Sequence, residues 1–183
     1  MKILSSILKY LKKKEKSRRF EMMKRGGLVV GDNFNMLEGC IIDASHYWHI
    51  RIGDNVTLAP NVHILAHDAS TKMHLGYTRI GKVTIGNRVF IGAGSIIMPG
   101  VTIEDNCIIG SGSIVTKDIQ SNTVACGNPA KMICKLDKFL IKHRQGMEKY
   151  PVFSEEYTIG KDISLALKQE MNYKMSNCFG YVV

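Results

Sequence analysis

Apolar residues recur at every sixth position through much of the chain. From Ile85 the sequence divides into six consecutive hexads: IGNRVF, IGAGSI, IMPGVT, IEDNCI, IGSGSI and VTKDIQ. Each hexad begins with a β-branched aliphatic residue, and its fifth residue is small or of medium size. A period of six is neither the 3.6 of a helix nor the 2 of an ordinary strand. The pattern therefore predicts a short strand followed by a tight turn, repeated, with the first position facing a narrow core.

The same period extends toward the N-terminus. Six further hexads also begin with an apolar residue: Val30, Met36, Ile42, Ile52, Leu58 and Ile64. Four extra residues, 48–51, interrupt this block, and a fifteen-residue insertion, 70–84, separates it from the regular one. Three hexads per turn would stack as a prism of parallel strands, a solenoid in which neighbouring coils bury what one coil cannot. Asparagines near the predicted corners suit left-handed backbone there.

The segments that flank the repeat have a different character, so we expect three parts. Residues 1–27 form a basic amphipathic helix, residues 28–131 the repeat domain with its insertion, and residues 132–183 a helical tail. In the tail we expect helices over 133–144 and 162–175, with Asp162 or Ser164 as the N-cap of the second. The default expectation for the tail is that it covers the last open coil.

Composition and charge exclude several classes of protein. The 183 residues suffice for one domain, and no apolar run is long enough to span a membrane. Nearly all of the net charge of +9 resides in residues 1–27, which carry ten Lys/Arg against two Glu, and the remaining residues contribute only +1. The repeat domain therefore lacks the basic surface of a nucleic-acid-binding protein. Five scattered cysteines without a CxxC pair argue against disulfides and favour a reducing, cytoplasmic location.

The basic N-terminal segment has two interpretations. Apolar residues at helical spacing form one face: Ile3, Leu4, Ile7, Leu8 and Leu11. Such a helix can pack on the repeat domain or on a neighbouring chain. It can instead make peripheral contact with anionic lipid at the inner face of the membrane through residues 1–25, where each Lys/Arg contributes about 1 kcal/mol.

The repeat resembles the hexapeptide-repeat acyltransferases over about residues 28–136. The most specific segments are IGDNVTLAPNV (52–62), VTIGNRVFIGAGSIIMPGVTI (83–103), IIGSGSIVTKDI (108–119) and ACGNPAK (125–131). Within that family the chain is most similar to maltose and galactoside O-acetyltransferases and to O-acetyltransferases of surface polysaccharides. The resemblance implies a mainly β fold, the left-handed parallel β-helix, and a homotrimer with sites between the prisms. It also implies acetyl-CoA as cosubstrate.

His67 is the expected general base. It stands at the edge of the insertion, where a loop can leave the regular solenoid and fold over a neighbouring surface. In the resembled enzymes a histidine of this segment takes the proton of the acceptor hydroxyl, a role typically worth about 10²–10⁴ in rate. We expect Asp68 or a main-chain carbonyl to hold the other ring nitrogen.

The resemblance also assigns the cosubstrate site, along the prism edge between two subunits. The matching residues in this chain are Ala93, Ser111, Thr116, Lys117 and Lys131. Small residues let the pantetheine arm lie against the backbone, and Lys131 supplies charge for a phosphate. A second basic residue of the family falls on Cys134, so Lys135 is the expected substitute.

The acceptor site is expected near the four extra residues. Asp43, His46 and Trp48 are the candidates, because an aromatic ring beside polar groups suits a sugar. The alternative for these residues is a bulge that packs on the N-terminal helix.

The function that follows is acetyl transfer from acetyl-CoA to a sugar hydroxyl, within a surface glycan or its precursor, by direct transfer in a ternary complex. One alternative is N-acetylation of an amino-sugar nucleotide. Another is a metal-dependent or non-catalytic prism of the carbonic anhydrase type, with His63, His67 and His74 as ligands. The different histidine spacing in those anhydrases favours a site with no metal.

Overall fold

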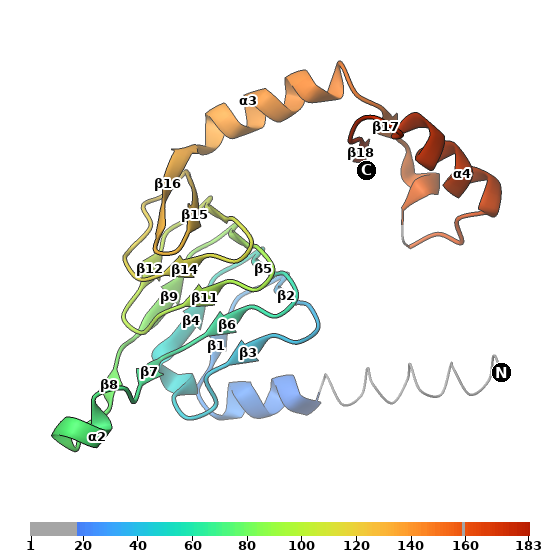
Figure 1. The fold of residues 1–183 in the computed structure, drawn as a ribbon. Helices are drawn as coiled ribbons and strands as arrows, with labels where there is room; N and C mark the ends of the chain where they lie inside the picture. Colours follow the sequence, from blue (N-terminus) through green and yellow to red (C-terminus); the bar gives the residue numbers. More distant parts are fainter. Residues whose placement is uncertain (1–17, 159) are drawn as a thin grey trace. The chain divides into compact units, whose positions relative to one another are not determined.

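Short parallel strands wind into a three-sided prism in the computed structural model, which describes residues 18–158 and 160–183 (Figure 1). The first coil contains β1 (Val29–Val30), β2 (Asn35–Met36) and β3 (Ile41–Ile42). The second contains β4 (Ile50–Ile52), β5 (Thr57–Leu58) and β6 (His63–Ile64). The third contains β9 (Val83–Ile85), β10 (Phe90–Ile91) and β11 (Ile96–Ile97). The fourth contains β12 (Thr102–Ile103), β13 (Ile108–Ile109) and β14 (Ile114–Val115).

Each face of the prism is a parallel sheet with one strand per coil. The first face has the order β1-β4-β9-β12, and the third has the order β14-β11-β6-β3. The second face continues past β13 into β15 (Thr123–Gly127) and β16 (Ala130–Lys135). First positions of hexads that lie one coil apart on the same face pair directly, as Ile52 does with Ile85. The prediction of a mainly β fold, the left-handed β-helix, is confirmed.

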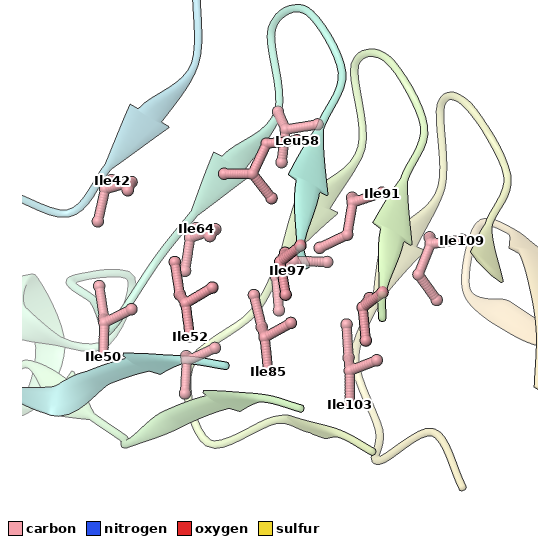
Figure 2. Close-up of a cluster of buried hydrophobic side chains, with 14 of the residues drawn as sticks. Ile42, Ile50, Ile52, Leu58, Ile64, Ile85, Ile91, Ile97, Ile103 and Ile109 are labelled. Atoms are coloured by element: carbon pink, nitrogen blue, oxygen red, sulfur yellow. The ribbon is translucent and has the colours of Figure 1, made fainter. Parts of the chain in front are cut away.

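The core consists of the first positions of the hexads (Figure 2). Eleven of the twelve are buried, and Val30 is partly buried against them. Burying a side chain of this size contributes about 1.5–3 kcal/mol. Fifth positions complete the filling, and where they are serines the hydroxyl is satisfied internally, since Ser95 and Ser113 both donate to the Gly110 carbonyl. The six-residue period is thus the period of the core.

The edge between the first and second faces, here called the first edge, is a column of left-handed residues. Asn33, Asn55, Asn106 and Asn122 have positive φ, and in the third coil Arg88, rather than an asparagine, takes this conformation. Side chains also bond along the column: the Asn33 amide donates to Asn55 Oδ1 at 3.1 Å, and Asn106 donates to Asn122 Oδ1 at 3.1 Å. Asparagine is therefore used here both for its backbone and for a ladder between coils.

The N-terminal helix, described over residues 18–25, lies across the end of the prism beside the first coil (Figure 1). Met23 is fully buried in the prism core, and the Phe20 ring stacks on Phe34 with centroids 5.8 Å apart. Packing on the repeat domain is thus confirmed for this part. The proposed lipid contact falls mainly on residues 1–17, which lie outside the described residues. In the described part of the chain, no helix is long and apolar enough to cross a bilayer.

Both interruptions of the repeat contain ordered structure. The insertion leaves the prism through an antiparallel pair, β7 (His67–Asp68) and β8 (Arg79–Ile80), with α2 (Lys72–Leu75) at its tip. It rejoins the prism at Val83, so the expected end at residue 84 lies two residues too late. The earlier interruption is a 3₁₀ turn, Tyr47–His49, and Ile50 and Arg51 already belong to β4.

The prediction of a helix from Ile133 is wrong at its start. Residues Ala130–Lys135 form β16, which pairs antiparallel with β15, as between Cys134 and Val124. The helix α3 spans Leu136–Met147 instead. Backbone pairing with β15 is a long-range contact that outweighs the local helical pattern. The first compact unit accordingly ends at Leu136, where the sequence suggested residue 131.

The second unit, residues 137–183, contains a small parallel pair, β17 (Val152–Phe153) and β18 (Tyr181–Val182), that the sequence did not predict. A 3₁₀ turn, Glu155–Tyr157, precedes α4 (Leu165–Lys174), which is shorter at both ends than the expected helix. Ser164, one of the two predicted N-caps, caps this helix, and its hydroxyl accepts from the Leu167 N–H at 3.3 Å. Coverage of the last coil by this unit stays a prediction.

Candidate active site

Two hexads break the core pattern, and both breaks lie at the edge between the third and first faces, here called the third edge. In every other hexad the fifth position holds an aliphatic residue, phenylalanine, serine or cysteine; in these two it holds His46 and Asp68. The strands that precede them, β3 and β6, are neighbours on the third face, with Ile42 paired to Ile64. Register alone therefore brings the segments after Ile42 and Ile64 together.

His67 and Asp43 form a direct pair at this edge. The distance between His67 Nδ1 and Asp43 Oδ2 is 2.5 Å, although the two residues are 24 positions apart in sequence. The Asp43 side chain is 3% exposed and that of His67 is 35% exposed. A buried carboxylate thus holds Nδ1 of the His67 imidazole, and part of the ring is exposed to solvent.

Asp43 is held rigidly by backbone donors. The Ala66 N–H donates to Oδ2 at 2.9 Å, and the Ser45 N–H donates to Oδ1 at 3.1 Å. Burial raises the pKa of the Asp43 carboxyl, but the hydrogen bonds from Ala66, His67 and Ser45 together outweigh it, so the pKa lies below its usual value. The group is a carboxylate at neutral pH.

The pair determines which ring nitrogen of His67 is free. An ionised carboxylate only accepts hydrogen bonds, so Nδ1 of His67 is the protonated nitrogen. In the neutral ring Nε2 then carries the lone pair, which is the form a general base requires. The prediction that Asp68 holds the other ring nitrogen of His67 was wrong, because Asp68 Oδ1 instead accepts from the Ser70 N–H at 2.9 Å. The residue that pairs with His67 is Asp43, which was expected at the acceptor site.

Aromatic rings surround the pair. The His46 ring lies 5.3 Å from the His67 ring and 5.3 Å from the Trp48 ring, between centroids. Trp48 is 58% exposed, so most of its indole surface is open. The 3₁₀ turn also packs on the end of the N-terminal helix, since a Cβ on Gly27 would meet Trp48 Cβ at 2.8 Å. Packing, the alternative interpretation of these residues, is thus observed for part of the turn, and the acceptor role of His46 and Trp48 stays a prediction.

The residues expected at the cosubstrate site lie on more than one edge of the prism. Ala93 and Ser111 stack in successive coils at the edge between the second and third faces, here called the second edge, where the Gly112 N–H donates to the Ala93 carbonyl at 2.8 Å. A Cβ on Gly92 would lie 2.5 Å from Ser111 N, so the coils approach very closely there. Lys131 is paired with Cys126 near this edge.

The other expected residues lie elsewhere. Thr116 and Lys117 follow β14 on the third edge, two coils beyond the coil of His67, a separation of about 10 Å at the usual strand spacing. Lys135 is paired with Thr123 at the opposite end of β16 from Lys131. One chain alone therefore does not gather the expected cosubstrate residues into one pocket.

The histidines of the anhydrase-type alternative are not gathered in the described residues. His63 is on β6 and His74 is on α2. Among residues 18–158 and 160–183, a single group of at least three side chains has the spacing of metal ligands, and its members are Asp43, His46 and His67. Within the described residues of one chain, the three histidines of that alternative are therefore not brought together as a ligand set.

Comparison with known proteins gives concordant results. The model of the bacterial transferase hexapeptide (six repeats) matches residues 82–117. Protein CapG of Staphylococcus aureus is 36% identical over 141 residues, which cover 73% of this chain and 80% of that protein. Galactoside O-acetyltransferase of Escherichia coli K12 is 44% identical over 108 residues, covering 57% of this chain and 50% of that enzyme.

Among solved structures, a maltose O-acetyltransferase from Clostridium difficile 630 is similar, with 45% identity and a TM-score of 0.51. The match covers 60% of this chain and 59% of the other. The chain thus spans little more than half the length of the sugar acetyltransferases it matches, and most of CapG.

Proposed function

The chain belongs to the hexapeptide-repeat acyltransferases, and we propose that it transfers an acetyl group from acetyl-CoA to a hydroxyl of a sugar. The observation that carries this proposal is the pairing of the partly exposed His67 ring with the buried Asp43 carboxylate. Similarity to galactoside and maltose O-acetyltransferases supports the sugar acceptor. We extend the acceptor to a surface glycan or its precursor, as the sequence resemblance implies.

The pair supports direct transfer. Nε2 of His67 removes the hydroxyl proton as the acceptor oxygen attacks the thioester carbonyl, which forms the new C–O bond. The C–S bond then breaks, and the proton passes from the imidazolium to the departing CoA thiolate. Asp43 keeps the ring in one orientation and stabilises its positive charge while it holds the proton. No covalent enzyme intermediate is needed.

A homotrimer accounts for the distribution of the expected cosubstrate residues. His67 lies on the third edge, whereas Ala93, Ser111 and Lys131 lie on or near the second edge. Two prisms placed side by side would bring the third edge of one against the second edge of the other. The pantetheine arm would then follow the small residues of one subunit toward His67 of its neighbour.

The outer surface of the prism supports such packing. Apolar side chains point outward from the second and third faces, with Phe90 and Ile41 each 45% exposed. The first face instead presents mainly polar residues, Arg51, Thr84 and Thr102, although Val29 in its first strand is 46% exposed. Exposed apolar groups on the second and third faces suit contact with another protein chain. Three copies can each offer one such face to each neighbour.

For the acceptor we propose Trp48 and His46 as contacts. An exposed indole offers an apolar plane for the C–H face of a sugar ring, and His46 stands between that plane and His67. This arrangement would place a sugar hydroxyl within reach of His67. Asp43 is not part of this contact set, because its carboxylate is buried and already bonded.

Release of free CoA thiol from acetyl-CoA tests the proposal. We expect turnover with sugar acceptors in wild type, and a loss of at least about 100-fold in His67→Ala, with CoA binding retained. His74→Ala is the matched control, since His74 is an exposed histidine of the same insertion. Near-normal turnover of His67→Ala would reject the base assignment. Thiol release with amines but not with hydroxyl acceptors would replace O-transfer by N-transfer.

A further inference from the structure

Asp43, His46 and His67 form a cluster that the acetyl-transfer step does not fully explain. Each residue offers one donor atom, and the three atoms all lie within 4.8 Å of one another. Two imidazoles and one carboxylate form the donor set of many zinc sites, in which water takes the fourth position. The partly exposed His67 ring leaves room for that water.

His46 supplies the observation that points to a ligand. Its Nδ1 atom is buried and has no hydrogen-bond partner among the described residues. Leaving a buried polar atom unpaired is unfavourable, so such atoms in native proteins call for a role. Acetyl transfer as proposed above uses Nε2 of His67 and does not require this nitrogen.

The surroundings of the cluster also suit a bound cation. The Ser45 and Ala66 N–H groups fix the Asp43 carboxylate, as supporting hydrogen bonds do for metal ligands. The Trp48 and His49 rings lie beside His46, at 5.3 Å and 5.8 Å between centroids, and restrict its orientation.

We propose that Zn²⁺ binds to Asp43, His46 and His67, and that the bound ion inhibits acetyl transfer. Tetrahedral ligands at about 2.0–2.1 Å from zinc lie about 3.3 Å apart. The 2.5 Å pair of Asp43 and His67 must therefore open and release its shared proton to solvent, while His46 moves inward. The ion and the catalytic pair thus exclude each other.

Metal binding and inhibition rest on different premises. Binding of the metal follows from the donor set alone, whereas inhibition rests on the proposed function of His67. The proposed zinc site departs from the sequence expectation of a site with no metal. Binding is accordingly measured first, by a readout that needs no turnover.

Co²⁺ is the spectroscopic probe. The full chain, stripped with chelator, is titrated with Co²⁺, and we expect a visible absorption band of a four- or five-coordinate site that Zn²⁺ abolishes. Sulfur-to-metal charge-transfer bands should be absent, which separates this site from the five free cysteines. His46→Phe keeps a ring between Trp48 and His67 but removes the nitrogen, and should weaken Co²⁺ binding at least about tenfold. His74→Ala should bind as wild type does.

The outcomes separate the two claims. Equal Co²⁺ affinity in His46→Phe and wild type, with both folded by circular dichroism, would overturn the metal site. If the site binds, thiol release by wild type should fall with Zn²⁺ and recover with EDTA, and His46→Phe should need at least tenfold more Zn²⁺ for the same fractional loss. Zn²⁺ binding without loss of rate would overturn inhibition. Full activity of His67→Ala would instead overturn the proposed function, whatever the cobalt spectrum shows.

Discussion

Replacing Asp43 with asparagine removes the negative charge of the pair and changes little else in shape. The asparagine oxygen can take the place of Oδ2, where it still accepts from the Ala66 N–H and from Nδ1 of His67. The amide nitrogen then faces the N–H of Ser45, an exposed residue, and this N–H loses its acceptor. The orientation of the imidazole is kept, so the variant isolates the effect of the charge on the imidazolium.

The magnitude follows from the geometry of the pair. Opposite charges 4 Å apart interact by about 4 kcal/mol at an effective dielectric constant of 20. Exposure of about one third of the His67 side chain reduces that value. A lower bound is the excess of a charge-assisted hydrogen bond over a neutral one, about 1 kcal/mol. A loss of about 1–3 kcal/mol in transition-state stabilisation corresponds to about 5- to 150-fold in kcat.

The assay is steady-state thiol release at saturating acetyl-CoA, with a thermal unfolding curve for each variant. Asp43→Asn should lose kcat within that range and keep its KM for acetyl-CoA. Asp43→Ala should lose more, because the ring is no longer oriented, and should also be less stable by about 1–3 kcal/mol, since the buried Ala66 N–H loses its acceptor. A kcat of Asp43→Asn within twofold of wild type would show that the carboxylate does not support the base.

Two further predictions concern the cosubstrate and the core. Lys131→Glu should raise the KM for acetyl-CoA at least severalfold and leave the KM for the acceptor unchanged, whereas Lys138→Glu, in α3, should change neither; equal effects on both substrates would argue against a phosphate contact. Ile97→Ala should lower the free energy of unfolding by about 2–5 kcal/mol and Ile97→Val by about 0.5–1.5 kcal/mol, because Ile97 is fully buried in the third coil. Urea denaturation measures both, and equal losses would contradict tight packing at that position.

The prism was predictable from sequence because its core repeats the period of the chain. Ile91 and Ile97 are buried for the same reason, namely that each begins a hexad and each hexad crosses one face. The strand β16 was not predictable in this way. Its pairing partner is β15, and no local period distinguishes residues 133–135 from the start of a helix. The small β17–β18 pair joins segments nearly thirty residues apart and left no repeated pattern.

The candidate site was likewise only partly predictable from the sequence. The place of His67 at the edge of the insertion, together with the family resemblance, predicts this histidine as the base, whereas its sequence neighbour Asp68 is not its hydrogen-bond partner. In a solenoid the neighbour in space is one coil away, so the hexad register was the better guide. Asp43 follows Ile42 and Ala66 follows Leu65, and the pairing of Ile42 with Ile64 places these segments in contact. The period of six therefore contains the register that places Asp43 beside His67.

The position of the site follows from the demands of the solenoid itself. A coil closes only if its fifth position fits beside a buried aliphatic residue, and nearly all hexads meet that demand with an apolar or small side chain. His46 and Asp68 do not, and at both the chain leaves the regular path, into a 3₁₀ turn and into the β7–β8 pair. Two polar fifth positions at the same edge therefore reduce the apolar surface that is buried there. Such departures concentrate at functional sites, and between these two lies the His67–Asp43 pair.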